Sequence, residues 1–357
     1  MNIRAIKYLA PFSIFILAYF SFTQNGWIIA SPLLYVFTFI PILELFIRPK
    51  PENLSDAEEQ VAKADKIYDI WLYLMVPFQY VAVYLFLVSI QNDSLTTLEL
   101  IGRILVMGIL CGAFGINVAH ELGHRKNLFE RNLSKALLLT SLYMHFYIEH
   151  NKGHHKNVST KEDPSSARRG EALYVFYFRT VIMGFISAWK IAADDQHKKG
   201  KKVLHFSNQM IQFQLLQLSV VLGIFFLFGL KIMLCFMAAA MVGFLLLETV
   251  NYIEHYGLER NLTSSGQYER AMPAHSWNSN HIIGRLMLFE LSRHSDHHYL
   301  ASRKYQILKH YDDAPQMPTG YPGMMILSFI PPLWFGIMNR KIDQFAKRNQ
   351  AILSAPK

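Results

Sequence analysis

The sequence is poor in cysteine and in charged residues. Its two cysteines, Cys111 and Cys235, both lie inside apolar stretches and form no CxxC pair, which excludes a disulfide framework and favours buried structural thiols. Charged residues make up 17% and hydrophobic residues 52% of the chain, whereas a soluble domain carries about a quarter charged residues. The composition therefore indicates a membrane protein. The mean hydropathy of +0.18 is modest, so a large polar part must accompany the apolar spans.

Six stretches are apolar enough, and at about 20 residues long enough, to cross a bilayer as helices. They cover residues 8–24, 28–47, 70–91, 98–118, 209–228 and 232–251. Two weaker apolar stretches, residues 137–148 and 324–338, are expected to be interfacial or to pack within the bundle. The sequence thus predicts an all-α integral membrane protein, with one membrane domain over residues 1–357 and six transmembrane helices.

Lysine and arginine gather on one side of the predicted spans. The links after spans one, three and five carry almost none, with Lys231 the clear exception, while the other side holds the run Lys198–Lys202 and many more. The positive-inside rule places both termini and two histidine-rich parts, residues 119–208 and 252–357, in the cytoplasm, as in a bacterial inner membrane. The net charge of +9 then serves topology and lipid headgroups, and can also dock an acidic protein. No nucleic-acid partner is expected, because the basic residues follow the membrane ends.

Nine of the fifteen histidines fall in four clusters at the cytoplasmic ends of these spans. The nine are His120, His124, His150, His154, His155, His255, His294, His297 and His298. Positions i and i+4 share one face of a helix, so His120 and His124 can bind one ion, and so can His150 and His154. Adjacent histidines point in different directions, which lets one segment serve two metals. This arrangement predicts metal binding.

The number and type of these ligands indicate two metal ions. Imidazole suits zinc, copper, iron and nickel, and no thiolate favours zinc or copper(I). Nine ligands are too many for one ion but suit two, each with four or five, and this leaves open positions that a closed structural zinc site lacks. We predict two iron ions, and an apolar substrate that enters from the lipid.

Several carboxylates lie close to the histidines. Glu121, Glu149, Glu254 and Asp296 each adjoin a box histidine or lie one residue away. They are expected to accept the second N–H of metal-bound histidines, with direct ligation or helix-end solvation as alternatives. Glu248 lies inside the sixth span, two turns before His255. It is either functional, as intramembrane carboxylates often are, or paired within the bundle.

The histidine clusters closely resemble those of the alkane 1-monooxygenase (alkane omega-hydroxylase) family. The matching segments are HELGHRK, IEHNKGHH, NYIEHYG and LSRHSDHH, together with HSWNSN from His275, PTGYPG from Pro318, Ser159-Thr160 and Asp163-Pro164-Ser165. The wider class of membrane desaturases and hydroxylases shares only the first, second and last boxes, in looser form. Glu248 departs from the family pattern, where a small or neutral residue is expected.

The resemblance implies a six-helix fold and two irons bound by the nine histidines. It also implies O2-dependent terminal hydroxylation of n-alkanes to 1-alcohols, with electrons passed from NADH through a reductase and a rubredoxin. The sequence contains no CxxC rubredoxin motif, so the carrier is expected to be a separate protein. A rubredoxin is expected to be acidic and would dock on basic residues. The candidates are Lys126, Lys152, Arg168, Arg169 and Arg293, with Lys198–Lys202 as a more distant rim.

An alkane offers no polar group, so chain length must be limited by a side chain that blocks an apolar tunnel. This tunnel should run outward from the irons between spans one to four. Tyr35, Val36 and Phe39 of span two are its candidate wall. Because Val36 is of modest size, we expect medium to fairly long chains to be accepted. Alternatively, Val36 faces lipid or a neighbouring helix.

Other functions fit the sequence less well. A lipid desaturase or a xylene-type methyl hydroxylase would share the histidine chemistry and differ in the pocket. An intramembrane zinc protease is suggested by the HExxH pattern of His120 to His124, with Glu121 as general base, but it leaves most box histidines unexplained. A metal transporter would place its ligands near mid-membrane, whereas these lie at the helix ends.

Overall fold

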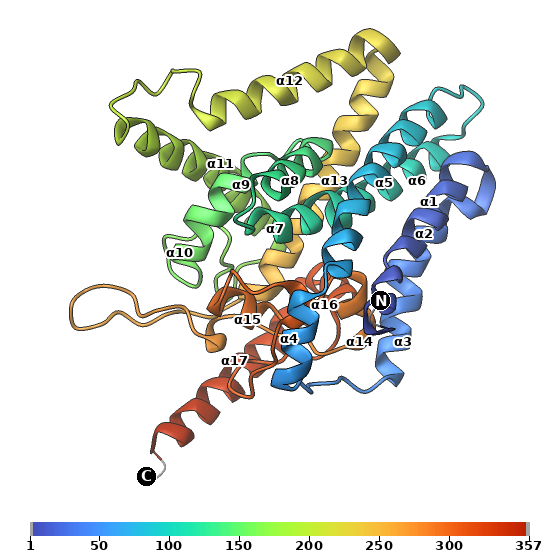
Figure 1. The fold of residues 1–357 in the computed structure, drawn as a ribbon. Coiled ribbons are helices and arrows are strands. Elements are labelled where there is room, and N and C mark those ends of the chain that lie inside the picture. The colour runs from blue at the N-terminus through green and yellow to red at the C-terminus, as the bar shows by residue number, and fades with distance from the viewer. Residues whose placement is uncertain (1–2, 355–357) are drawn as a thin grey trace.

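Long helices dominate the computed structural model, which describes residues 3–354 (Figure 1). No β-strand is present among these residues, and only two isolated bridges occur, Leu262 with Tyr268 and Asn278 with Gln316. The predicted all-α fold is confirmed. Seven helical stretches of the described chain are long and apolar enough to cross a membrane. They are Arg4–Thr23, Gly26–Phe46, Ile67–Ser89, Thr97–Gly123, Leu173–His197, Gln209–Phe228 and Leu230–His255.

Six of these stretches coincide with the predicted spans, and the seventh, α11 (Leu173–His197), was assigned to a cytoplasmic part. Its mean hydropathy of 1.3 is the lowest of the seven. Arg179, Lys190, Asp194 and Asp195 interrupt its apolar sequence, which is why the sequence does not single it out as a span.

Two of the long helical stretches, and one shorter helical segment, change from α to π geometry. The first stretch consists of the 3-10 helix η1 (Ile3–Leu9) and α1 (Phe12–Thr23). The second consists of the 3-10 helix η2 (Gly26–Ala30), α2 (Ser31–Leu34), the π-helix η3 (Tyr35–Phe39) and α3 (Ile40–Phe46). They are followed by α4 (Asp56–Ala64), α5 (Ile67–Ser89), α6 (Thr97–Leu110), the π-helix η4 (Cys111–Ile116) and α7 (Asn117–Gly123). Next come α8 (Leu128–Thr140), α9 (Phe146–Glu149), the π-helix η5 (His150–His154), α10 (His155–Asn157), α11, α12 (Gln209–Phe228) and α13 (Leu230–His255). Pro41 has no N–H to donate, which accounts for the wider turn at η3. Such turns are rare and occur mostly at functional sites.

Glycines let α6 and α13 approach closely. A Cβ at Gly108 would lie 2.3 Å from Cγ1 of Val242, and a Cβ at Gly243 would lie 2.4 Å from Cβ of Cys111. The two helices run on to α7 and to the end of α13, so this contact brings the first and third histidine clusters together.

Arg103 of α6 ties together the ends of two other helices at the other end of the bundle. Its side chain is buried and donates to the carbonyl oxygens of Ser21 at 3.1 Å, Ser89 at 2.7 Å and Gln24 at 2.8 Å. These carbonyls lie at the C-terminal ends of α1 and α5, where helical carbonyls lack partners within the helix. The guanidinium therefore replaces water as their donor.

The helices that follow α13 lie largely on the side of the molecule where α13 ends (Figure 1), and α16 packs against α13. These helices are η6 (Pro273–His275), α14 (Ile282–Met287), α15 (His294–Tyr299), η7 (Tyr305–Ile307), α16 (Tyr321–Ser328) and α17 (Pro331–Ser354). The two weaker apolar stretches lie in part within α8, α16 and α17. There Leu137, Met324 and Trp334 are fully buried.

Candidate metal centre

The nine predicted histidines come together in two adjoining groups. Ligand nitrogens within each group lie within 4.8 Å of one another. The larger group contains five histidines: His120, His124, His150, His155 and His297. The smaller contains four: His154, His255, His294 and His298. All are buried except His124 and His155, which are half-buried.

The segments divide their histidines between the groups largely as expected. His120 and His124 share one group, and the adjacent pairs His154–His155 and His297–His298 are each split between the two. However, His150 and His154, which were expected to share one ion, lie in different groups. These residues form the π-helix η5, whose wider turn places positions i and i+5 on one face. Nε2 of His150 accordingly lies 3.0 Å from Nε2 of His155.

The imidazoles approach one another through their Nε2 atoms. Nε2 of His120 lies 2.8 Å from Nε2 of His297, and Nε2 of His154 lies 3.2 Å from Nε2 of His298. Nε2 of His255 is buried and has no hydrogen-bond partner within the described chain. Because neutral imidazoles cannot satisfy one another when so many acceptor nitrogens converge, each group fits a cation that accepts their lone pairs.

Burial keeps most of these histidines in the neutral form that binds metals. It lowers the pKa of His124 to about 3, and the pKa values of His150 and His297 well below the ordinary value. His154 differs. Burial lowers its pKa too, but the charge and hydrogen bond of Asp163, together with the charges of Glu149 and Glu248, raise it above the ordinary value. At neutral pH, most histidines of both groups are therefore uncharged and able to bind a metal ion.

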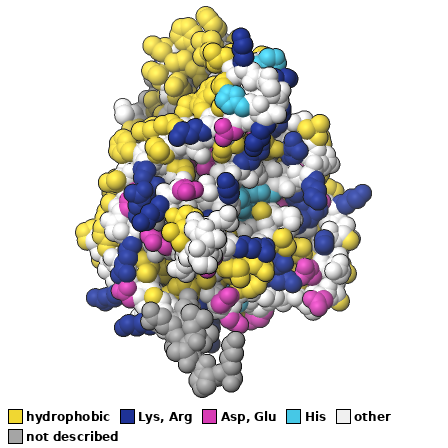
Figure 2. Space-filling model, turned by 90° about the vertical axis from the view of Figure 1, so that its left-hand side faces the viewer, with side chains coloured by type: hydrophobic (Ala, Val, Ile, Leu, Met, Phe, Trp, Pro, Cys, Tyr) yellow, Lys and Arg dark blue, Asp and Glu magenta, His cyan; other side chains and the backbone are white. Residues whose placement is uncertain are grey.

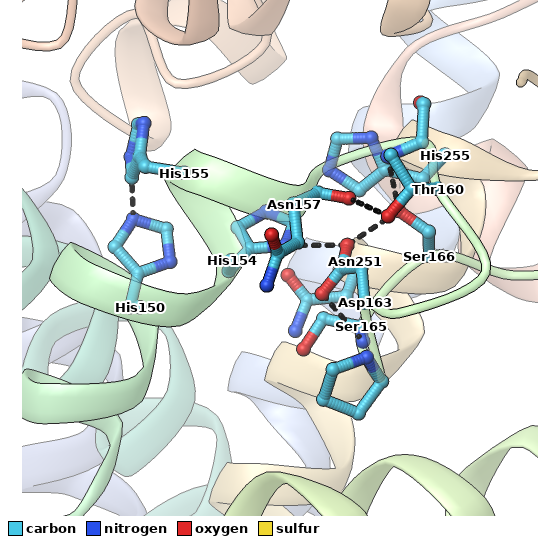
Figure 3. A network of polar contacts seen from close by, with 12 residues as sticks. His150, His154, His155, Asn157, Thr160, Asp163, Ser165, Ser166, Asn251 and His255 are labelled. Atoms are coloured by element: carbon cyan, nitrogen blue, oxygen red, sulfur yellow. Dashed lines mark hydrogen bonds and ion pairs between the residues drawn. The ribbon is translucent and has the colours of Figure 1, made fainter. Parts of the chain in front are cut away.

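Asp163 orients His154 from behind and was missed as a site residue, although its segment was part of the family resemblance (Figure 3). Its Oδ2 lies 2.9 Å from Nδ1 of His154, and it also accepts hydrogen bonds from Ser166 and from the backbone of Ser165. This arrangement fixes the ring and leaves Nε2 free to bind metal. Asp163 lies nine residues along the chain from His154, so the spacing rules used for the boxes could not find it.

Of the five predicted carboxylates, only Glu254 contacts a box histidine within the described chain. Its Oε2 lies 3.1 Å from Nε2 of His294. Glu121 instead pairs with Arg125 at 2.6 Å, and Asp296 pairs with Arg303 at 3.0 Å. Both still stiffen the segments that carry the histidines.

Within the described chain, Glu149 and Glu248 form no ion pair with a box histidine. Burial raises the pKa of Glu149 to about 8. Glu248 accepts hydrogen bonds from Tyr143 at 2.8 Å, Thr180 at 2.8 Å and Asn251 at 3.0 Å. These bonds connect α13 with α11 and with the turn after α8. Glu248 is therefore paired within the bundle.

An apolar cavity leads from span two to both histidine groups. Its lining includes Val36 and Phe37 of η3, and His120, His150 and His294 at the metal end. Tyr35 and Phe39 are not among the residues that line it. Asn117, Asn251 and Glu254 are the other polar or charged residues of the lining. The lining of this cavity thus suits an apolar molecule, and one end of the cavity lies at the two histidine groups.

The basic face is only partly as predicted. Lys126, Lys152, Arg168 and Arg169 are exposed. Arg293 is 3% exposed, and its guanidinium donates to the carbonyl oxygens of Leu308 and Glu52. Arg293 therefore cannot dock a partner and instead holds the segment before the last histidine cluster.

Comparison with known proteins gives a consistent result. Residues 98–328 match the family model of fatty acid desaturases. The chain is 39% identical over 321 residues to alkane 1-monooxygenase 2 of Pseudomonas aeruginosa, which covers 89% of this chain and 84% of that protein. It is 45% identical over 255 residues to alkane 1-monooxygenase 1 of the same species, covering 71% and 67%. A more distant relative is the xylene/toluene monooxygenase hydroxylase component XylM of Pseudomonas putida, which is 28% identical over 273 residues and covers 76% and 72%.

The alkane 1-monooxygenases match most of the chain. The protein is a multi-pass membrane enzyme, and it belongs to the alkane 1-monooxygenase family.

Proposed function

We propose that this enzyme hydroxylates the terminal methyl group of n-alkanes with O2, at two iron ions held by the five-histidine and four-histidine groups. The observation that carries the proposal is the apolar cavity that ends on both groups, at His120, His150 and His294. An alkane can fill such a cavity only by presenting one chain end to the metals. Its relatives named alkane 1-monooxygenase support the same reaction.

The donor set favours iron. Nine imidazoles without a thiolate suit iron, and four or five donors leave each ion an open position. When bound, the irons would supply the activation of O2 that hydroxylation requires. The chain itself keeps most of the imidazoles neutral, orients His154 through Asp163 and excludes water with apolar walls.

Chain length is set by the far end of the cavity. Val36 and Phe37 of η3 and Ile40 of α3 lie on the wall formed by span two. Because the wall contacts are apolar, they recognise length and not polarity. A larger side chain at Val36 would shorten the space available to the substrate.

The course of the chain supports an orientation with both termini in the cytoplasm. α7 and α13 end side by side, since His120 and His255 lie in adjoining groups. The chain between the end of α7 and the start of α13 must therefore cross the membrane an odd number of times. Gly229 alone joins α12 to α13, and an odd number results when α12 crosses and α11 does not. Six spans, with the histidines at the cytoplasmic side of a bacterial inner membrane, follow from this reasoning and the basic loops.

The electrons would come from a separate rubredoxin, itself reduced by an NADH-dependent reductase. The half-buried His124 and His155 are the members of the larger group that reach toward the surface. Figure 2 shows histidine side chains near the middle of one face, with lysine and arginine around them. Exposed Lys126 and Lys152 lie close in the sequence to His124 and His155. Such a surface attracts an acidic carrier.

A substrate panel tests this function. Purified, iron-loaded enzyme with rubredoxin, its reductase and NADH is given n-alkanes, xylenes and fatty acyl lipids, and products are identified by mass spectrometry. We expect O2-dependent 1-alcohols from the alkanes. Desaturated acyl chains as the main product, or methyl-hydroxylated xylenes with no alkane product, would contradict the proposal.

A further inference from the structure

The rings of the metal centre have a front and a back. The contacts between ring nitrogens of box histidines join Nε2 to Nε2, as between His298 and His294 at 2.9 Å. The Nε2 atoms therefore face the metal positions, and the Nδ1 atoms face away. A carboxylate beside Nδ1 orients a ring, whereas a carboxylate beside Nε2 lies on the metal side.

Two carboxylates contact these rings from opposite sides. Asp163 Oδ2 lies 2.9 Å from Nδ1 of His154, on the back. Glu254 Oε2 lies 3.1 Å from Nε2 of His294, the same nitrogen that contacts Nε2 of His298. Glu254 also lines the cavity beside His294. It thus occupies the side of the four-histidine group that faces the substrate.

In the described chain, Glu254 has no lysine or arginine as a counter-charge. The residue is 1% exposed, and its Oε1 accepts a hydrogen bond from the hydroxyl of Tyr321 at 2.7 Å. In the described part of the chain, no lysine or arginine forms an ion pair with it. The buried Glu121 and Asp296, by contrast, each have an arginine. A buried ionised carboxylate without a counter-charge is strongly unfavourable.

We propose that Glu254 is a direct ligand of the metal ion held by His154, His255, His294 and His298. This inference rests on the proposed function, because it requires that ion to be bound. The carboxylate would bring the smaller group to five donors, and the ion would supply the missing counter-charge. Tyr321 holds the other oxygen and so fixes which oxygen faces the metal.

One consequence is an electrical difference between the two sites. The five-histidine group consists of neutral donors, whereas the other group would carry one negative charge. An anionic ligand stabilises the more oxidised state of a metal, so the iron of the four-histidine group should be harder to reduce. The easily reduced iron is then the one beside half-buried His124 and His155, where electrons would arrive.

Mössbauer spectroscopy of enzyme loaded with iron-57 tests this assignment, because it reports on each iron separately. In Glu254→Gln, we expect one of two quadrupole doublets to shift while the other stays in place. Tyr321→Phe keeps the carboxylate but removes its hydrogen bond, and should shift the same doublet by less. Glu149→Gln is the matched control, since it makes the same change beside His150 at a carboxylate that forms no ion pair with a box histidine in the described chain, and it should shift neither doublet.

The outcomes separate the two proposals. If wild-type enzyme holds fewer than two irons, the proposed function fails. If Glu254→Gln and Tyr321→Phe both keep two irons and both spectra coincide with that of the wild type, Glu254 is not a ligand, although the proposed function stands. If Glu254→Gln does not fold, the Tyr321→Phe spectrum alone decides, and an unchanged spectrum overturns the assignment.

Discussion

The turn before the last histidine cluster depends on one buried ion pair. Phe289 and Glu290 have φ angles of 49° and 59°, a left-handed conformation that costs non-glycine residues roughly 1–2 kcal/mol each. The Glu290 carboxylate offsets this cost. It accepts a hydrogen bond from Tyr8 at 2.6 Å and pairs with Arg285 at 2.6 Å and Lys7 at 3.4 Å. The N-terminal segment thereby holds the turn that leads to His294.

The pKa of Glu290 sets the size of this effect. Burial would raise it, but the charges of Arg285 and Lys7 prevail and lower it to about 2, from 4.5. Since a tenfold change in an acid constant is worth about 1.4 kcal/mol, the ionised carboxylate contributes on the order of 3 kcal/mol to folding. Because the folded-state pKa is the lower one, this contribution is present above about pH 4.5 and is lost as the pH falls toward 2.

Glu290→Gln should therefore lower the free energy of unfolding by roughly 3 kcal/mol at neutral pH. The assay is denaturant unfolding of wild type and variant in matched micelles between pH 7 and pH 3. The difference between them should shrink below about pH 4.5, because the wild type then loses its own charge. Glu162→Gln, at an exposed position, is the control and should change little. A difference that is absent at pH 7, or equally large at pH 3, would refute the reasoning.

Three further predictions concern the substrate, the bundle and the electron carrier. Val36→Trp should shorten the longest n-alkane oxidised and leave short-chain activity largely intact, as measured by the product spectrum; an unchanged spectrum in folded, iron-loaded enzyme would remove Val36 from the tunnel wall. Arg103→Leu leaves at least three carbonyl oxygens without their donor and should cost about 3 kcal/mol or more in unfolding free energy, whereas Lys231→Leu at the exposed Asp93 pair should cost under about 1 kcal/mol. Raising the salt concentration should slow rubredoxin-dependent turnover, since screening shortens to about 3 Å at 1 M; a rate independent of salt, and of charge reversal at Lys152 and Arg168, would show that the basic face does not steer the carrier.

The spacing of histidines predicted the composition of the metal centre but not how it is divided. All nine histidines come together in the two groups. They do so because each cluster lies at or next to a helix end, and these helix ends lie on the same side of the bundle. The pairing of His150 with His155 depends on a π turn, and no spacing rule based on the α-helix predicts that. The role of Asp163 depends on a loop that returns to His154, which is likewise not visible in the sequence.

Burial was the other property that sequence could not supply. Arg293 carries the positive charge expected of a docking residue, yet its guanidinium is buried and donates to backbone carbonyl oxygens. α11 is long enough to span but carries scattered charges, so its place depends on how α7 and α13 end. Glu254 acquires its significance from Tyr321, which is 67 positions away in the chain.

The central claim is that nine histidines hold two irons in this single chain. It is tested most directly by the metal content of the purified protein, determined by elemental analysis against protein concentration from amino-acid analysis. The account predicts close to two iron ions per chain and no stoichiometric zinc. One metal ion per chain, or zinc in place of iron in a preparation that oxidises alkanes, would contradict it.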